Sequence, residues 1–129
     1  MKKIKTLIDG FESNYGGTDI LTPMMKAVEL DTGNKQKRIF VLTDGQVNNN
    51  TEIINYATVC RDAARFHTFG IGSDCSKQLI REVAVAGRGP SNFAQDDSPE
   101  LAGLVIEALK HSFEPSLFNC TFDWPSRKL

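Results

Sequence analysis

The chain has 129 residues, of which 40% are apolar and 24% charged, and its formal net charge is -1. This length predicts one domain with one core, and this composition excludes a disordered chain. The nearly balanced charge provides no basic surface for nucleic acid or an anionic membrane, and no stretch is apolar enough to cross a membrane, so we expect neither as a partner.

The cysteines Cys60, Cys75 and Cys120 are odd in number and widely spaced. Such spacing fits neither a disulfide framework nor a zinc site. Cys60 stands among apolar positions, so buried free thiols are the simpler expectation. Free thiols and the lack of an apolar leader segment favour a reducing, cytoplasmic location.

The first predicted helix covers residues 2–13, where apolar residues recur at helical spacing with lysines opposite. A loop at residues 13–17 follows, and its two consecutive glycines permit a close backbone approach to a ligand. A second helix begins after Thr18 and Asp19, either of which can cap it, and ends before Gly33.

Residues 38–44 form the first predicted strand. Four consecutive apolar residues at positions 39–42 leave no polar face, so this pattern predicts a central parallel strand covered by helices on both sides. The strand ends at Asp44 and Gly45. Ligands of open α/β sheets bind just outside the carboxyl ends of the strands, which makes Asp44 a candidate ligand-binding residue.

The rest of the chain alternates helices and strands. The predicted elements are, in order, a helix from Thr51, a strand at 66–72, a helix between Ser76 and Gly87, a strand at 91–95 and a helix from Ser98. This alternation predicts an α/β fold with a three-stranded parallel sheet, right-handed crossovers and helices on both faces. Residues 117–124 alternate with period 2 and predict one further strand.

Two loops carry oxygen atoms that could bind a metal. They are residues 16–19, ahead of the second helix, and residues 43–45, after the first strand. Hydroxyl and carboxylate oxygens suit a hard cation such as Mg²⁺. Thr18 or Asp19 can equally cap a helix, and Asp44 can equally serve a turn. The residues by themselves leave both interpretations open.

Other motifs are weaker. Gly70 and Gly72 follow a strand as in nucleotide-binding loops, so a nucleotide-binding α/β domain is the alternative function, although the third glycine of that motif is missing. His67 falls within a predicted strand, where a structural role is expected because no catalytic triad order is visible. The sequence has no Gly-x-Ser-x-Gly nucleophile motif, and we do not expect an enzyme.

Three motifs in fixed order resemble a known family. They are Gly-Gly-Thr-Asp-Ile at 16–20, Phe-Val-Leu-Thr-Asp-Gly-Gln-Val at 40–47 and Thr-Phe-Gly-Ile-Gly-Ser at 68–73. Together they closely resemble the von Willebrand factor type A (vWA) domain. More narrowly, they resemble the branch found beside the inter-alpha-trypsin inhibitor (VIT) module in that inhibitor's heavy chains and in vault poly(ADP-ribose) polymerase. The resemblance implies a Rossmann-like fold and a non-catalytic protein-interaction module.

The resemblance also implies a metal-ion-dependent adhesion site (MIDAS), in which an acidic side chain of a protein partner completes the coordination of Mg²⁺. Thr18 matches the threonine whose hydroxyl reaches the metal, and Asp44 matches the aspartate that acts through a water. The Asp-x-Ser-x-Ser motif, which supplies further ligands in the family, does not occur in this sequence. We therefore expect the chain to bind divalent metal weakly or not at all.

The matching region, residues 1–116, resembles a partial vWA domain that lacks the first strand with its Asp-x-Ser-x-Ser motif, and residues 117–129 resemble the start of a following β segment. In the family order, that first strand lies beside residues 39–43. Its loss predicts an exposed edge there and self-association through it. A secreted location would follow if the parent protein resembles the inhibitor heavy chains.

Overall fold

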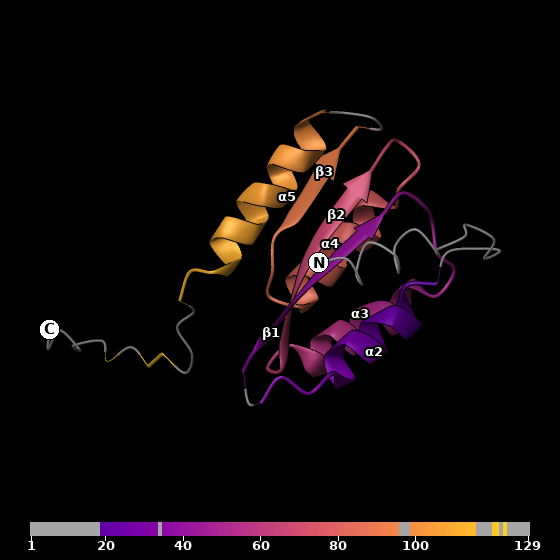
Figure 1. Cartoon of the computed structure of the whole chain (residues 1–129). Helices are drawn as coiled ribbons and strands as arrows, with labels where there is room; N and C mark the ends of the chain where they lie inside the picture. The colour runs from indigo at the N-terminus through magenta and orange to yellow at the C-terminus, as the bar shows by residue number, and fades with distance from the viewer. Residues whose placement is uncertain (1–18, 34, 96–98, 116–119, 122, 124–129) are drawn as a thin grey trace, which may run out of the picture.

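The computed structural model describes residues 19–33, 35–95, 99–115, 120, 121 and 123. Its elements are, in chain order, α2 (Leu21–Glu29), β1 (Lys37–Thr43), α3 (Asn50–Cys60), β2 (Ala64–Ile71), α4 (Lys77–Ala86), β3 (Ser91–Ala94) and α5 (Pro99–Ser112). Helices and strands alternate as the sequence pattern predicts (Figure 1). The helix predicted at 2–13 lies outside the described residues.

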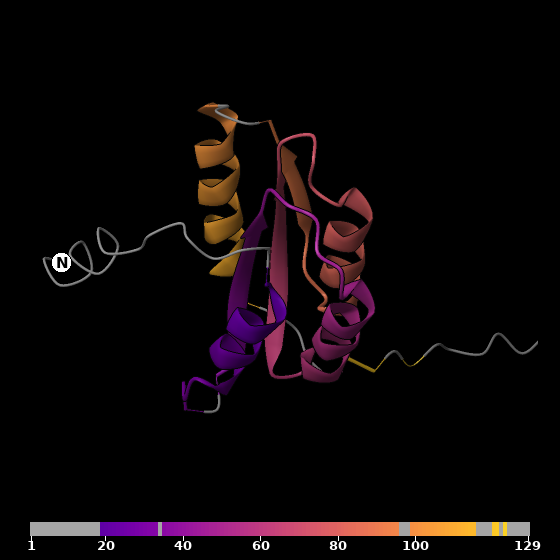
Figure 2. The same ribbon diagram turned by 90° about the vertical axis from the view of Figure 1, so that its right-hand side faces the viewer.

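The strands form one parallel sheet in the order β1-β2-β3. Helices α2, α3 and α4 lie on one face of this sheet, and α5 lies on the other, against β3 (Figure 2). Each crossover between consecutive parallel strands carries a helix, as short right-handed connections require. The prediction of a Rossmann-like α/β fold with helices on both faces is confirmed.

The main core lies between the sheet and the face that carries α2, α3 and α4. Phe66 of β2 is fully buried there, together with Ile53 and Ala57 of α3 and Leu79 of α4. The apolar stripe predicted for α4 is confirmed, and its start is fixed by Ser76, whose Oγ accepts a hydrogen bond from the backbone N–H of Leu79 at 3.4 Å. Periodic apolar positions thus build this layer.

Strand β1 occupies an edge of the described sheet, and β2 is central. Among the described residues, β1 pairs with β2 alone. Ile39 and Val41 are half-buried, and Leu42 is 48% exposed. Among the described residues β1 thus stands at an edge, as the family order predicts for residues 39–43, and not at the central position that the apolar run alone indicates. An apolar run reflects helices above and below a strand, and it carries no information on lateral neighbours.

Strand boundaries differ from the predicted ones by two residues at most. Strand β2 begins at Ala64, because Ala64 and Arg65 pair with the first two residues of β1. The strand predicted at 117–124 lies mostly outside the described residues, and Cys120, Thr121 and Asp123 are not in a strand. The three cysteines are free, as predicted, but only Cys75 is buried, whereas Cys60 is half-buried and Cys120 is exposed. No helix in the described part of the chain is long and apolar enough to span a membrane.

Candidate functional site

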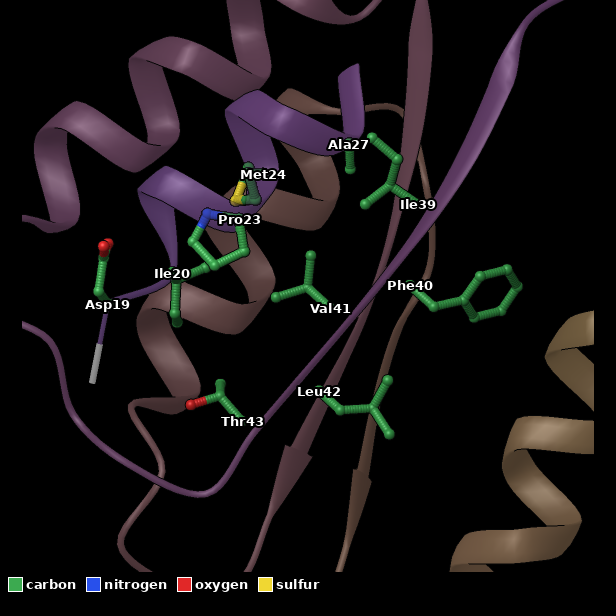
Figure 3. Close-up of a pocket in the computed structure, with 10 residues that line it drawn as sticks. All are labelled: Asp19, Ile20, Pro23, Met24, Ala27, Ile39, Phe40, Val41, Leu42 and Thr43. Carbon is green, nitrogen blue, oxygen red and sulfur yellow. The ribbon is translucent and has the colours of Figure 1, made fainter. Parts of the chain in front are cut away.

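A groove of about 310 Å³ lies between α2 and β1. It is lined by Asp19, Ile20, Pro23, Met24 and Ala27 and by residues 39–43 (Figure 3). Along β1, Ile39 and Val41 point toward α2, whereas Phe40 and Leu42 point to the opposite face. The groove therefore lies beside β1, on the side of α2. The walls of this groove are mainly apolar.

Strand β1 ends in a short turn that the side chain of Thr43 stabilises. The hydroxyl oxygen Oγ1 of Thr43, which is buried, accepts a hydrogen bond from the backbone N–H of Gly45 at 3.3 Å. It also lies 3.5 Å from the carbonyl oxygen of Gly45. This turn leaves Asp44 exposed to solvent at the end of the strand. Asp44 therefore stands where the position of ligand sites in α/β sheets predicts a binding residue.

Asp19 serves the start of α2. Its Oδ1 accepts a hydrogen bond from the backbone N–H of Thr22 at 3.2 Å. Hydrogen bonding to Thr22 lowers the pKa of the Asp19 carboxyl, which favours its charged form. Asp19 thus satisfies a backbone N–H in the first turn of α2 from one residue before the N-cap position, which Ile20 occupies without a side-chain cap bond. Thr18 lies outside the described residues.

Asp19 and Thr43 line the same groove, so the two oxygen-bearing loops meet at one end of it. Their oxygens are nevertheless engaged in a helix start and a turn. The described residues contain no group of three or more His, Cys, Asp or Glu side chains that could hold a metal. An octahedral Mg²⁺ site needs six oxygen ligands. The described residues therefore do not form a complete metal site.

The glycines at the end of β2 serve packing and a turn. A Cβ atom on Gly70 would lie 2.8 Å from Cys75 Sγ and 2.9 Å from Phe93 Cδ1, so neighbouring side chains already fill the space that this glycine leaves. Gly72 has a φ of 75°, a conformation that glycine adopts without strain. The close approach is between parts of the protein itself, and nothing in the described chain favours a nucleotide there.

His67 lies on the face of β2 opposite α4, where it is 4% exposed. Its ring stacks on Phe40 with 4.7 Å between centroids, and within the described structure neither ring nitrogen has a hydrogen-bond partner. Burial lowers the pKa of the imidazole, and the positive charges of Arg65 and Arg38 lower it further. His67 is therefore a neutral packing residue, in agreement with the structural role predicted for it.

We expect His67 to make the fold less stable in mild acid. The folded pKa lies below the ordinary value of about 6.5, so the unfolded chain binds the proton first as the pH falls, and stability declines below that value. His67→Phe should remove this part of the pH dependence and keep the stacking on Phe40. Thermal unfolding of both proteins between mild acid and mild alkali measures it. Parallel curves for the two proteins would contradict the assignment.

The groove itself was not predicted from periodicity. On α2, Met24 is buried. Pro23 and Ala27 have short side chains, however, and they face the strand across the groove (Figure 3). Two short residues one helical turn apart, Pro23 and Ala27, are the sequence signal from which this space could have been predicted.

Comparison with known protein families gives a match to the model described as von Willebrand factor type A domain, over residues 1–93. A von Willebrand factor A domain-containing protein of Dictyostelium discoideum is 29% identical over 125 residues, which are 96% of this chain and 13% of that protein. The mouse von Willebrand factor A domain-containing protein 5B1 is 25% identical over 118 residues, which are 91% of this chain and 10% of that protein. This chain thus spans a small part of the relatives' length.

Proposed function

The chain belongs to the von Willebrand factor type A domain family, and we propose that it is a non-catalytic protein-interaction module whose binding surface includes the carboxyl end of β1, around Asp44, and, by the family resemblance, Thr18. The exposed carboxylate of Asp44, at the end of a strand in a fixed turn, carries this proposal. We also propose, from the sequence motifs that contain these two residues, that the chain belongs to the branch of the family found beside VIT modules.

The absence of catalysis is supported by the state of the reactive side chains. His67 is buried and stacked on an aromatic ring, so it cannot exchange protons with a substrate at the surface. Cys75 is buried, and its Sγ contacts the carbonyl oxygen of Gly72 at 3.3 Å. Both side chains are buried, so neither is exposed to a substrate at the surface.

A metal at the proposed surface would need ligands beyond those that the described residues supply. Thr18 and Asp44 match one direct ligand and one ligand that acts through water in the family site, and the described residues do not complete six oxygens. We propose that Mg²⁺ is held firmly only when other parts of a larger assembly supply the remaining oxygens. The protein partner would present an acidic side chain to that ion.

We expect magnesium to leave the stability of this chain unchanged. A ligand present at 100 times its dissociation constant stabilises the folded state by about 2.7 kcal/mol, so a firm site would raise the melting temperature clearly. Thermal unfolding in millimolar Mg²⁺ and in a chelator should give the same midpoint. Asp44→Asn and the control Asp31→Asn, an exposed carboxylate beyond the end of α2, should behave alike. A rise that only Asp44→Asn abolishes would overturn the proposed lack of firm binding.

A further inference from the structure

We propose that Arg38 and Arg65 form a binding site for a phosphate group on the face of the sheet that carries α5. The observations that carry this inference are the pairing of the two side chains across β1 and β2, the buried donors beside them and the charges around them. Both residues stand near the amino ends of their strands, whereas Asp44 follows the carboxyl end of β1. The inference therefore does not depend on the proposed metal site.

The two arginines are neighbours across the sheet. Arg38 and Arg65 are Cα partners in the parallel register of β1 and β2, and neighbouring strands lie about 4.8 Å apart. Two positions along each strand, Phe40 and His67 are partners in the same register, and their rings stack. Side chains two positions apart on a strand share a face. Arg38 and Arg65 therefore stand side by side on the face of this stacked pair, which is the face opposite α2 (Figure 3).

The two guanidiniums lack a counter-charge in the described part of the chain. Like charges on neighbouring strands repel each other. Among the described residues, neither Arg38 nor Arg65 forms an ion pair with a carboxylate. Both side chains are half-buried, so salt screens their repulsion less than it would at an open surface. A bound anion removes this repulsion, and the planar fork of a guanidinium matches the oxygens of a phosphate.

Buried nitrogen atoms without partners lie beside the two charges. Within the described structure, Nε of Arg65 is buried and has no hydrogen-bond partner, and the same holds for both ring nitrogens of His67. Burial lowers the pKa of His67, and the charges of Arg65 and Arg38 lower it further, so the three side chains interact electrostatically. Buried donors without partners are uncommon in folded proteins. A phosphate group accepts several hydrogen bonds and would supply the missing acceptors.

The end of α5 lies beside Arg38. Nη2 of Arg38 donates a hydrogen bond to the carbonyl oxygen of Glu114, just beyond α5, at 3.3 Å. A guanidinium has five N–H donors, so this bond leaves others for a ligand. The carboxylate of Glu114 lies 3.2 Å from Nδ1 of His111. This carboxylate is thus engaged by His111, and it does not neutralise the arginine pair.

The charge of the pair favours phosphate over other anions. Two guanidiniums carry two positive charges, which a phosphate dianion balances and a single carboxylate does not. The net charge of the whole chain is -1, so general attraction of anions is not expected and binding depends on the local geometry. We therefore expect phosphate to bind more tightly than acetate.

A titration with sodium phosphate at constant ionic strength, followed by the amide NMR signals, tests the site. The signals of Arg38 and Arg65 should shift saturably, and sodium chloride and sodium acetate should shift them less. The ring of His67 gives a second readout, because a nearby anion favours the imidazolium and raises its pKa. Equal responses to phosphate and chloride would overturn the proposal.

Phosphoserine presents the same group on an amino acid and identifies the source of the ligand. Tighter binding of phosphoserine than of inorganic phosphate would support the site and point to a phosphorylated protein segment. Binding that is no tighter would support the site and point to free phosphate. Saturable binding of neither compound would overturn the proposal.

Arg65→Gln should raise the dissociation constant for phosphate by about tenfold or more, because it removes charge-assisted hydrogen bonds. Arg65→Lys keeps the charge without the fork and should give an intermediate constant. The matched control is Arg61→Gln, which removes the same charge from an exposed residue at the end of α3 and should bind phosphate like the unaltered chain. Equal binding by Arg65→Gln and Arg61→Gln would contradict the site. Circular dichroism shows whether each variant has kept its fold, and Arg38→Gln gives the same comparison if Arg65→Gln has not.

Discussion

Phe66→Ala is expected to lower the free energy of unfolding by about 3–5 kcal/mol, the usual cost of removing a buried aromatic side chain. Phe66 is 0% exposed and lies in the core between β2 and the helices α3 and α4. Its backbone is held on the side of β3, where its N–H donates to the carbonyl oxygen of Gly87 at 3.1 Å. Because the strand is fixed in this way, the core cannot collapse fully into the space.

Equilibrium denaturation of Phe66→Ala measures this loss. The control is Val85→Ala, which shortens an apolar side chain of α4 that is 79% exposed and should change stability by less than about 0.5 kcal/mol. A loss below about 1 kcal/mol for Phe66→Ala would mean that this side chain is not part of a close-packed core.

Gly89→Ala is expected to destabilise the fold by about 3 kcal/mol or more, because a Cβ atom there would overlap the backbone carbonyl oxygen of Phe66. Gly89 is also tied to α4, since its N–H donates to the carbonyl oxygen of Ala84 at 2.9 Å. The connection between α4 and β3 therefore passes directly over β2. Backbone cannot rotate aside as a side chain can.

Gly103→Ala provides the matched control. Gly103 lies inside α5, where a Cβ atom would meet nothing within 4 Å. Alanine is favoured over glycine within a helix, so this variant should gain about 0.5–1 kcal/mol. Denaturation of the two variants should shift the midpoint in opposite directions. A Gly89→Ala protein as stable as the unaltered chain would contradict the close approach of the two backbones.

Much of the fold was predictable because local patterns determine it. The apolar positions of α4, its Ser76 cap and its end at Gly87 can all be read from residues within one helix, and the structure confirms them. The alternation of helices and strands likewise determined the parallel sheet. The lateral position of β1 could not be obtained in this way. Strand order depends on contacts between residues that are far apart in the sequence, and local patterns do not record such contacts.

The candidate site was predictable only in its location. The carboxyl end of β1 and the start of α2 do meet, as the two loops suggested, and Asp19 and Thr43 line one groove. Which oxygens remain available could not be read from the sequence, since the hydrogen bonds of Asp19 and Thr43 depend on the local backbone geometry. The role of Asp44 toward a metal stays a prediction.

The most direct test of the proposed interaction surface is a magnesium titration of the 129-residue chain followed by the amide NMR signals of the loops around Thr18 and Asp44. Because the described residues supply no complete set of ligands, these signals should show no saturable shift at micromolar Mg²⁺. A saturable shift in that range, present in the unaltered chain and absent in Asp44→Asn, would contradict the proposal that a firm metal site needs ligands from outside the chain.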